Sequence, residues 1–96
     1  MDFLERVINN VSELQAVIDK EIGRDDIEVK DFRLYTEHHE HPETKEQFDR
    51  FGATAVVVVG GKEYNIDKNS VKFFTAPQAC NAIIAYVKYV CCNLTN

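Results

Sequence analysis

The side chains with the most distinctive chemistry are three histidines in one short acidic cluster, Glu37-His38-His39-Glu40-His41. Neutral imidazoles beside a carboxylate suit zinc or nickel, and in an extended segment His39 and His41 would project to the same side. No cysteine or further histidine nearby completes a ligand set. We therefore expect a solvated loop, with His38, His39 and His41 as candidate metal ligands only, and no cofactor.

A pH-dependent contact is the other chemistry that this cluster allows. Three carboxylates, Glu37, Glu40 and Glu43, accompany the three histidines. Because histidine titrates near pH ~6.5, protonation of all three imidazoles would take the segment from a charge of about −3 to neutral.

Cys80, Cys91 and Cys92 all fall in the last apolar segment of the chain. Cys80 and Cys91 are eleven residues apart, and the corresponding rise of about 16 Å along a helix exceeds the ~7 Å Cα limit of a disulfide. Free thiols indicate a reducing compartment, so we expect a cytoplasmic protein. A catalytic Cys–His pair is not expected, because every histidine lies in an acidic cluster that disfavours a thiolate.

Gly60-Gly61-Lys62 resembles a phosphate-binding loop only superficially. That motif needs a serine or threonine after the lysine, whereas Glu63 follows here. Two consecutive glycines suit a two-residue hairpin turn instead. No carboxylate pair stands out as a general acid and base either, so the sequence indicates that the protein is not an enzyme.

Charge is distributed unevenly along the chain. Residues 1–49 contain 14 acidic and six basic side chains, a net charge of −8, whereas the remainder contains two acids and five bases, a net charge of +3. An acidic half repels nucleic acid and attracts basic protein surfaces, although a solvated surface that maintains solubility would look the same. No apolar stretch approaches the ~20 residues of a membrane span, and the acidic start lacks the basic region of a secretory signal.

The length of 96 residues fits a single domain, residues 1–96. A helix capped by Asp2 and Glu5 is predicted to end at Gly23, because apolar residues recur every three or four positions. Its apolar stripe is Leu4, Val7, Ile8, Val11, Leu14, Ile18 and Ile22. A strand over residues 27–36 follows, with a bulge near Lys30-Asp31 where the alternation changes phase.

The middle of the chain is predicted to contain a polar loop at residues 37–42 and a short helix over residues 42–51 that ends at Gly52. Residues 53–59 are continuously apolar and predict a central strand buried on both faces. The double glycine then leads into a strand over residues 62–67, and residues 71–74 complete the sheet.

The last helix is predicted to begin after Thr75, with Gln78 at the capping-box position. From residue 76 to residue 96 the only charged side chain is Lys88, so the helix has a second apolar face, Cys80, Ile84, Val87 and Cys91. Either the helix is central, between the sheet and the first helix or the loop after the first strand, or this face meets a second copy of the chain. We favour the second alternative and expect a homodimer.

These elements predict an α+β fold in the order α-β-β-β-α, a three- to four-stranded antiparallel sheet with the N-terminal and C-terminal helices packed on one face. Over its last ~45 residues this order, with residues 56–62 followed by an alanine-containing helix, resembles the double-stranded RNA-binding domain. That family places lysines at the start of its second helix to grip phosphates, but Ala76-Pro77-Gln78-Ala79 stands there in this sequence. The resemblance implies the fold and not RNA binding.

We therefore expect a non-enzymatic interaction module that binds a basic protein surface. By analogy with viral anti-defence proteins, it would be a small acidic inhibitor that stands in for a nucleic acid. The expected partner-binding acids are Glu5, Glu13, Asp19, Glu21, Asp25, Asp26, Glu28, Glu37, Glu40 and Glu43. The alternative is a small-ligand or metal-binding protein that uses the histidines or a sheet–helix pocket near Tyr64 or Tyr86.

Overall fold

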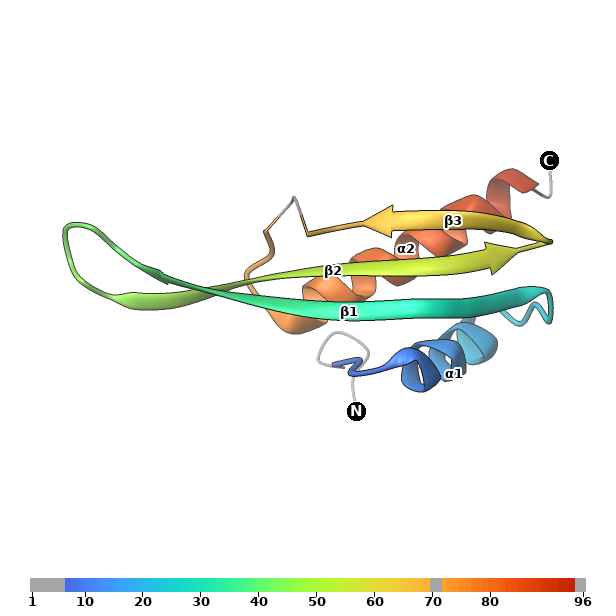
Figure 1. The fold of residues 1–96 in the computed structure, drawn as a ribbon, viewed down its shortest axis with the longest axis horizontal. Coiled ribbons are helices and arrows are strands. Elements are labelled where there is room, and N and C mark those ends of the chain that lie inside the picture. The colour runs from blue at the N-terminus through green and yellow to red at the C-terminus, as the bar shows by residue number, and fades with distance from the viewer. Residues whose placement is uncertain (1–6, 70–71, 95–96) are drawn as a thin grey trace.

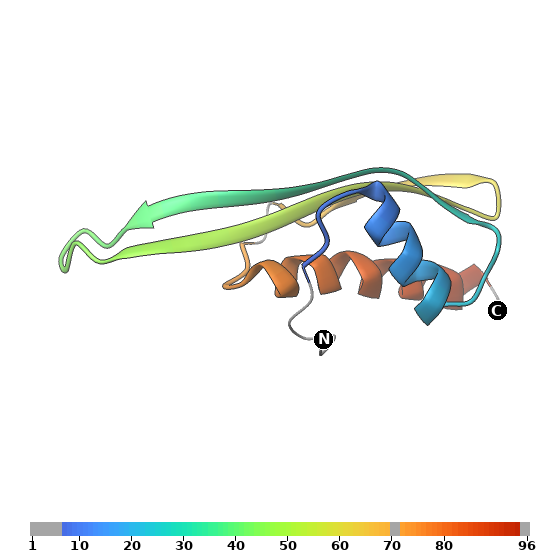
Figure 2. The same cartoon turned by 90° about the horizontal axis from the view of Figure 1, so that it is seen from below.

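The chain folds into two helices and one antiparallel sheet, seen in a computed structural model that describes residues 7–69 and 72–94 (Figure 1). The described elements are α1 (Val11–Glu21), β1 (Ile27–Glu40), β2 (Gln47–Val59), β3 (Lys62–Asp67) and α2 (Ala76–Leu94). The strands lie in the order β1-β2-β3, and both helices cover the same face of the sheet (Figure 2). The predicted element order and fold class are confirmed.

Helix α1 begins later than its apolar stripe suggests. Asp2, Leu4 and Glu5 lie outside the described residues, and Val7 to Asn9 are not helical. The side chain of Asn10 accepts a hydrogen bond of 2.9 Å from the Glu13 amide, which fixes the start of the helix at this cap. At the other end Gly23 adopts a φ of 71°, as predicted for a residue that ends a helix.

Strands β1 and β2 form a hairpin that is much longer than predicted. The expected loop at residues 37–42 and the expected helix at residues 42–51 are both wrong, because β1 continues to Glu40 and β2 begins at Gln47. The intervening turn is closed by a 2.9 Å hydrogen bond from the His41 amide to the Glu46 carbonyl. Backbone pairing extends these strands where no apolar pattern marks them. The bulge between Val29 and Asp31 is confirmed.

The second hairpin turn is confirmed at Gly60 and Gly61, which both have positive φ, 57° and 83°. The predicted fourth strand is reduced to one bridge, in which Phe73 exchanges backbone hydrogen bonds of 2.8 and 2.9 Å with Phe51. Val71 lies outside the described residues.

The core lies between the sheet and the two helices. Helix α2 is central: Cys80, Ile84, Val87 and Cys91 are all buried within the chain, in the same cluster as residues of α1 and the sheet. The Ile8 amide, for example, lies 3.4 Å from the sulfur of Cys80. The four residues that we expected to form a self-association surface are therefore not at the surface, because this small fold does surround its last helix.

The opposite face of the sheet is bare. Along β2, Ala53, Ala55, Val57 and Val59 are buried, whereas the alternate residues Thr54, Val56 and Val58 remain partly exposed. No described element covers them (Figure 2). The prediction that this strand is buried on both faces is wrong for the second face. Within the described residues, no helix is both long and apolar enough to cross a membrane.

Candidate functional site

A two-stranded arm, residues 36–51, projects beyond the rest of the fold (Figures 1 and 2). Strand β3 pairs with β2 only from Thr54 onward. The backbone hydrogen bonds of Lys68 with Ala53 and of Phe73 with Phe51 are the last ones on this edge of β2 within the described residues. Beyond Phe51, β1 and β2 pair only with each other within the described chain. The projection gives the molecule its elongated dimensions of 50 × 26 × 22 Å.

The arm is acidic. It contains five carboxylates and two basic side chains, a net charge of −3. The carboxylates are Glu37, Glu40, Glu43, Glu46 and Asp49. Three of the acids that the sequence nominated for partner binding, Glu37, Glu40 and Glu43, are therefore brought together on one projecting element, and all three are exposed.

The three histidines also lie on the arm, but they point apart. Strand alternation puts His38 and His39 on opposite faces, where His38 Nδ1 lies 2.7 Å from Asp49 Oδ1 and His39 Nε2 lies 2.7 Å from Glu37 Oε1. His41 sits in the turn, and its Nδ1 accepts a 3.2 Å hydrogen bond from the Glu43 amide. No group of three metal-ligating side chains forms anywhere in the described residues. The geometry therefore gives the metal interpretation no support.

A row of stacked side chains stiffens one face of the arm, and sequence reasoning missed it. The His39 ring stacks on Phe48 with centroids 5.3 Å apart, and the guanidinium of Arg50 lies 4.4 Å from Phe48 and 4.5 Å from Phe74. Phe74 comes from the segment before α2 and remains 69% exposed. The stacking follows from the strand register, which pairs His39 with Phe48. This register could not be predicted from the sequence, because the hairpin was not recognised there.

An ion pair ties the same segment to the base of the arm. Lys72 Nζ lies 3.0 Å from Glu37 Oε2, and this hydrogen-bonded cation lowers the pKa of Glu37 below its ordinary value. Residues 72–74 thus brace the arm from the side of the sheet that the helices leave bare.

The remaining nominated acids do not form one surface with the arm. Glu5 lies outside the described residues. Glu13, Asp19 and Glu21 belong to α1, where Glu21 lies 3.3 Å from Lys88, and Asp25 follows in the connecting turn. Asp26 pairs with Arg24 at 2.6 Å, which lowers the pKa of Asp26, and Glu28 pairs with Lys30 at 3.0 Å. The acids are thus spread over the helical side, the bare face and the arm.

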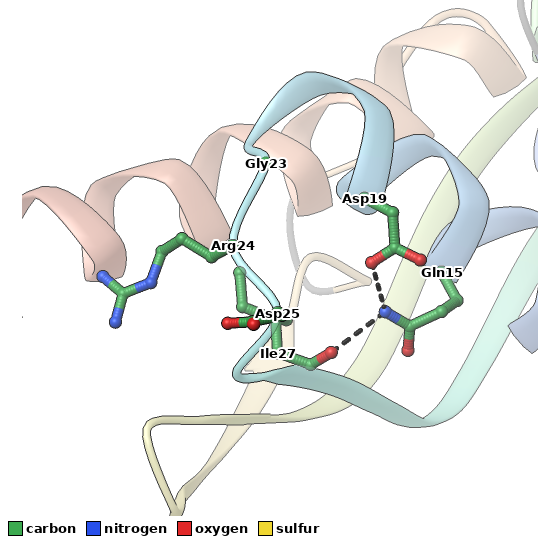
Figure 3. Close-up of a pocket in the computed structure, with 6 residues that line it drawn as sticks. All are labelled: Gln15, Asp19, Gly23, Arg24, Asp25 and Ile27. Atoms are coloured by element: carbon green, nitrogen blue, oxygen red, sulfur yellow. Dashed lines mark hydrogen bonds between the residues drawn. The ribbon is translucent and has the colours of Figure 1, made fainter.

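A shallow hollow beside the α1–β1 connection is lined by Gln15, Asp19, Gly23, Arg24, Asp25 and Ile27 (Figure 3). The Gln15 side chain in its wall already has partners: it donates hydrogen bonds of 3.0 Å to Asp19 and to the Ile27 carbonyl, and accepts one of 2.7 Å from the Val29 amide. Gln15 therefore caps the outer edge of β1. Tyr64 and Tyr86, the expected lining of a ligand pocket, pack against the core and not around this hollow.

The described residues offer a projecting acidic arm and a bare sheet face, and they contain no group of three metal-ligating side chains. No family model, curated protein or solved structure matches this chain. Its function is therefore inferred from these surfaces.

Proposed function

We propose that this chain is a non-enzymatic protein-interaction module that presents its arm, residues 36–51, to a basic groove or surface of another protein. The observation that carries the proposal is the arm itself: an acidic, two-stranded projection of which only Phe51, at its base, packs against the described core (Figure 2).

The arm is organised in advance for contact. A two-stranded ribbon is marginally stable in water, so its order depends on cross-strand side-chain pairs. The arm has several: His38 with Asp49 at 2.7 Å, the Gln47 side-chain amide donating to the Glu40 carboxylate at 3.0 Å, and the stacked row around Phe48. A preformed contact element loses less conformational entropy on binding than a flexible loop does, which supports its use as a recognition element.

The charge of the arm supports a basic partner. Exposed carboxylates raise association rates with positively charged surfaces, and the effect weakens as salt screens it. An inhibitor that occupies a basic groove, including one that normally receives nucleic acid, is the form of this function that we favour. The described acids of α1, which were also expected to bind the partner, do not form one surface with the arm, so the proposal rests on the arm.

Affinity capture from the source cells, at salt concentrations of about 50 mM and about 300 mM, would identify the partner, and calorimetry on the purified pair would test the arm. One variant replaces residues 38–49 with Asn-Gly, which joins the paired residues Glu37 and Arg50 by a two-residue turn. A second carries Glu40→Gln, Glu43→Gln and Glu46→Gln. The matched control, Glu13→Gln, Asp19→Asn and Asp25→Asn, removes the same charge from the α1 side.

We expect the shortened variant to lose binding and the arm triple variant to bind about tenfold to about 100-fold more weakly at low salt. The α1-side control should stay within about twofold of the parent affinity. A shortened chain that folds and binds its partner as tightly as the parent would refute the proposal.

A further inference from the structure

The bare side of the sheet carries an apolar row with acidic flanks. On this side Val58 of β2 lies between Glu28 and Glu63, and Val56 lies between Asp31 and Asn65. The whole surface, which we term the valine face, comprises Glu28, Asp31 and Arg33 of β1, Thr54, Val56 and Val58 of β2, and Glu63, Asn65 and Asp67 of β3.

The composition of β2 is that of a strand covered on both sides. A sheet with one solvated face usually alternates apolar and polar residues, whereas residues 55–59 are an alanine followed by four valines. The helices bury Ala55, Val57 and Val59 completely or nearly so, and leave Val56 and Val58 partly exposed. The sequence thus provides an apolar surface that the described chain does not use.

The valine face has defined ends. Toward the arm it is closed by Asn69, which packs so tightly on Gly52 that a Cβ on that glycine would lie 2.2 Å from the Asn69 Oδ1 atom. At the opposite end the strands turn at Gly60 and Gly61. Between these limits the β2 row from Thr54 to Val58 spans about 13 Å, and three strands span about 10 Å across. One helix of about 10 Å diameter, in contact over two to three turns, matches that area.

The charges on the two flanks differ. On β1, Glu28 pairs with Lys30 at 3.0 Å and Asp31 pairs with Arg33 at 3.5 Å. On β3, neither Glu63 nor Asp67 has a basic partner within the described part of the chain, and Asp67 accepts only the amide of Asn69 at 2.8 Å. The β3 flank is therefore the side with carboxylates available to a cation from another molecule.

We propose that the valine face is a second interaction surface, and that it packs against an amphipathic helix of another protein. The apolar side of that helix lies on Val56 and Val58, and its lysine or arginine side chains reach Glu63 and Asp67. A sheet face covered by a helix is the same arrangement that the chain itself uses on its other side (Figure 2). This surface is separate from the arm, so the two proposals stand or fall independently.

A second copy of the chain fits this surface poorly. Face-to-face packing that places β3 on β3 would bring the carboxylates of both flanks together, which is unfavourable. In the other two-fold orientation the β3 carboxylates would face the β1 flank, where Arg33 already pairs with Asp31. The outward side of α2 offers no unpaired cation to this surface either, because the single charge of α2, Lys88, already lies 3.3 Å from Glu21.

The test uses the full chain labelled with ¹⁵N and a synthetic amphipathic helical peptide of leucine and lysine, with a leucine–glutamate peptide of the same pattern as its control. Val56→Thr with Val58→Thr removes the apolar row but keeps the β-branched shape. Glu63→Gln with Asp67→Asn removes the flanking charge. Glu43→Gln with Glu46→Gln at the arm tip is the matched control for charge.

We expect the lysine peptide to shift the amide signals of β2 and β3 around Val56, Val58 and Glu63, and to do so equally in the shortened-arm variant, which lacks the acidic arm that would also attract a cationic peptide. The threonine pair should weaken binding about tenfold and the β3 charge pair about threefold to tenfold, with no change in the arm-tip control. A variant that fails to fold would be recognised by its spectrum, and the conservative charge pair then carries the test.

The proposal is overturned if the lysine peptide does not bind the shortened-arm variant, if its shifts there map to α1 and not to the valine face, or if the glutamate peptide binds equally well. It is also overturned if dilution of the protein alone shifts the valine-face signals, because a second copy would then be the occupant. The shortened-arm variant separates the two proposals: it should keep peptide binding while losing the partner captured through the arm.

Discussion

The two halves of the β1–β2 hairpin share one hydrogen-bonded ladder but differ in what stabilises them. In the half that lies away from the arm, Val29 and Phe32 of β1 and Val57 of β2 are buried under the helices. In the arm half, pairing continues from Thr36 and Phe51 to Glu40 and Gln47 with no buried hydrophobic residue. The first half is stabilised by burial of apolar area, and the arm by side-chain pairs across the strands.

This contrast separates folding from recognition. The buried half tolerates little change, because its side chains fill a small core. The arm can vary its exposed side chains at a low cost in stability, which suits a surface that meets a partner. The variants below test that division, from the largest expected effect to the smallest.

Ile83→Ala in α2 should lower the free energy of unfolding by about 2–5 kcal/mol, because it leaves a cavity beneath the sheet. Ile83 has no exposed surface. Urea denaturation followed by circular dichroism measures the loss. Phe48→Ala on the arm is the comparison, and a similar loss in both variants would show that the two halves of the hairpin do not differ as described.

Gly52→Ala tests the junction between the halves. The added methyl group would approach Oδ1 of Asn69 to 2.2 Å and its Cα to 2.7 Å, so the segment after β3 must move. We expect a loss of about 1–3 kcal/mol from this overpacking. Thermal unfolding provides the measurement, with Thr54→Ala on the same strand as the control. Equal stability of the two variants would contradict the close contact.

Gln15→Ala tests the edge of the buried half. Its side-chain amide satisfies both the Ile27 carbonyl and the Val29 amide, so truncation should cost about 1–2 kcal/mol. Hydrogen exchange at the Val29 amide should accelerate in parallel. The exposed Gln47→Ala variant on the arm should change the free energy of unfolding by less than about 0.5 kcal/mol. An unchanged exchange rate at Val29 would argue against the cap.

Arg50→Gln removes the cation that lies between Phe48 and Phe74. We expect a local loss of about 0.5–1 kcal/mol, because each contact is partly solvated. Amide hydrogen exchange measures this local loss: the arm amides should exchange faster, with little change at Val57. Equal acceleration in both halves would mean that the arm and the core open together.

Lys72→Met should raise the pKa of Glu37 toward its ordinary value, since the lysine is the main cause of the depression. A carboxyl group with a depressed pKa stabilises the folded state above its unfolded pKa, and that contribution is lost as the pH falls through the folded pKa. An NMR titration of the Glu37 side chain measures the change. Lys45→Met at the arm tip is the control and should leave this titration unaltered.

Local sequence signals identified the ends of several elements correctly. Gly23 ends the α1 segment and Gly60-Gly61 turns the second hairpin. The Gln78 amide donates a 3.3 Å hydrogen bond to Thr75 Oγ1 at the start of α2, as expected of a cap. Each of these features is decided by residues within a few positions of one another, which is why the sequence reveals them.

The arm could not be predicted in the same way. Hydrophobic alternation marks a strand only when one face is buried, and the arm has no buried face. Its strands depend on pairing between residues such as His39 and Phe48, nine positions apart, and on the brace from Lys72. The late start of α1 could have been predicted, because Asn10 and Glu13 form a capping pair. The apolar spacing of Val7 and Ile8 favoured a longer helix instead.

Because two of the three cysteines are buried, the third is a suitable site for attaching a label. Cys80 and Cys91 are buried, whereas Cys92 is exposed. Burial raises the pKa of the Cys91 thiol above its ordinary value. Since the thiolate is the reactive form, a maleimide should attach first at Cys92. The C-terminal end of α2 lies away from the arm, on the side of the sheet that the helices cover (Figures 1 and 2). Val56 and Val58 lie on the other, bare side. A sensor chip coupled through that one sulfur would leave both proposed contact surfaces facing the solution.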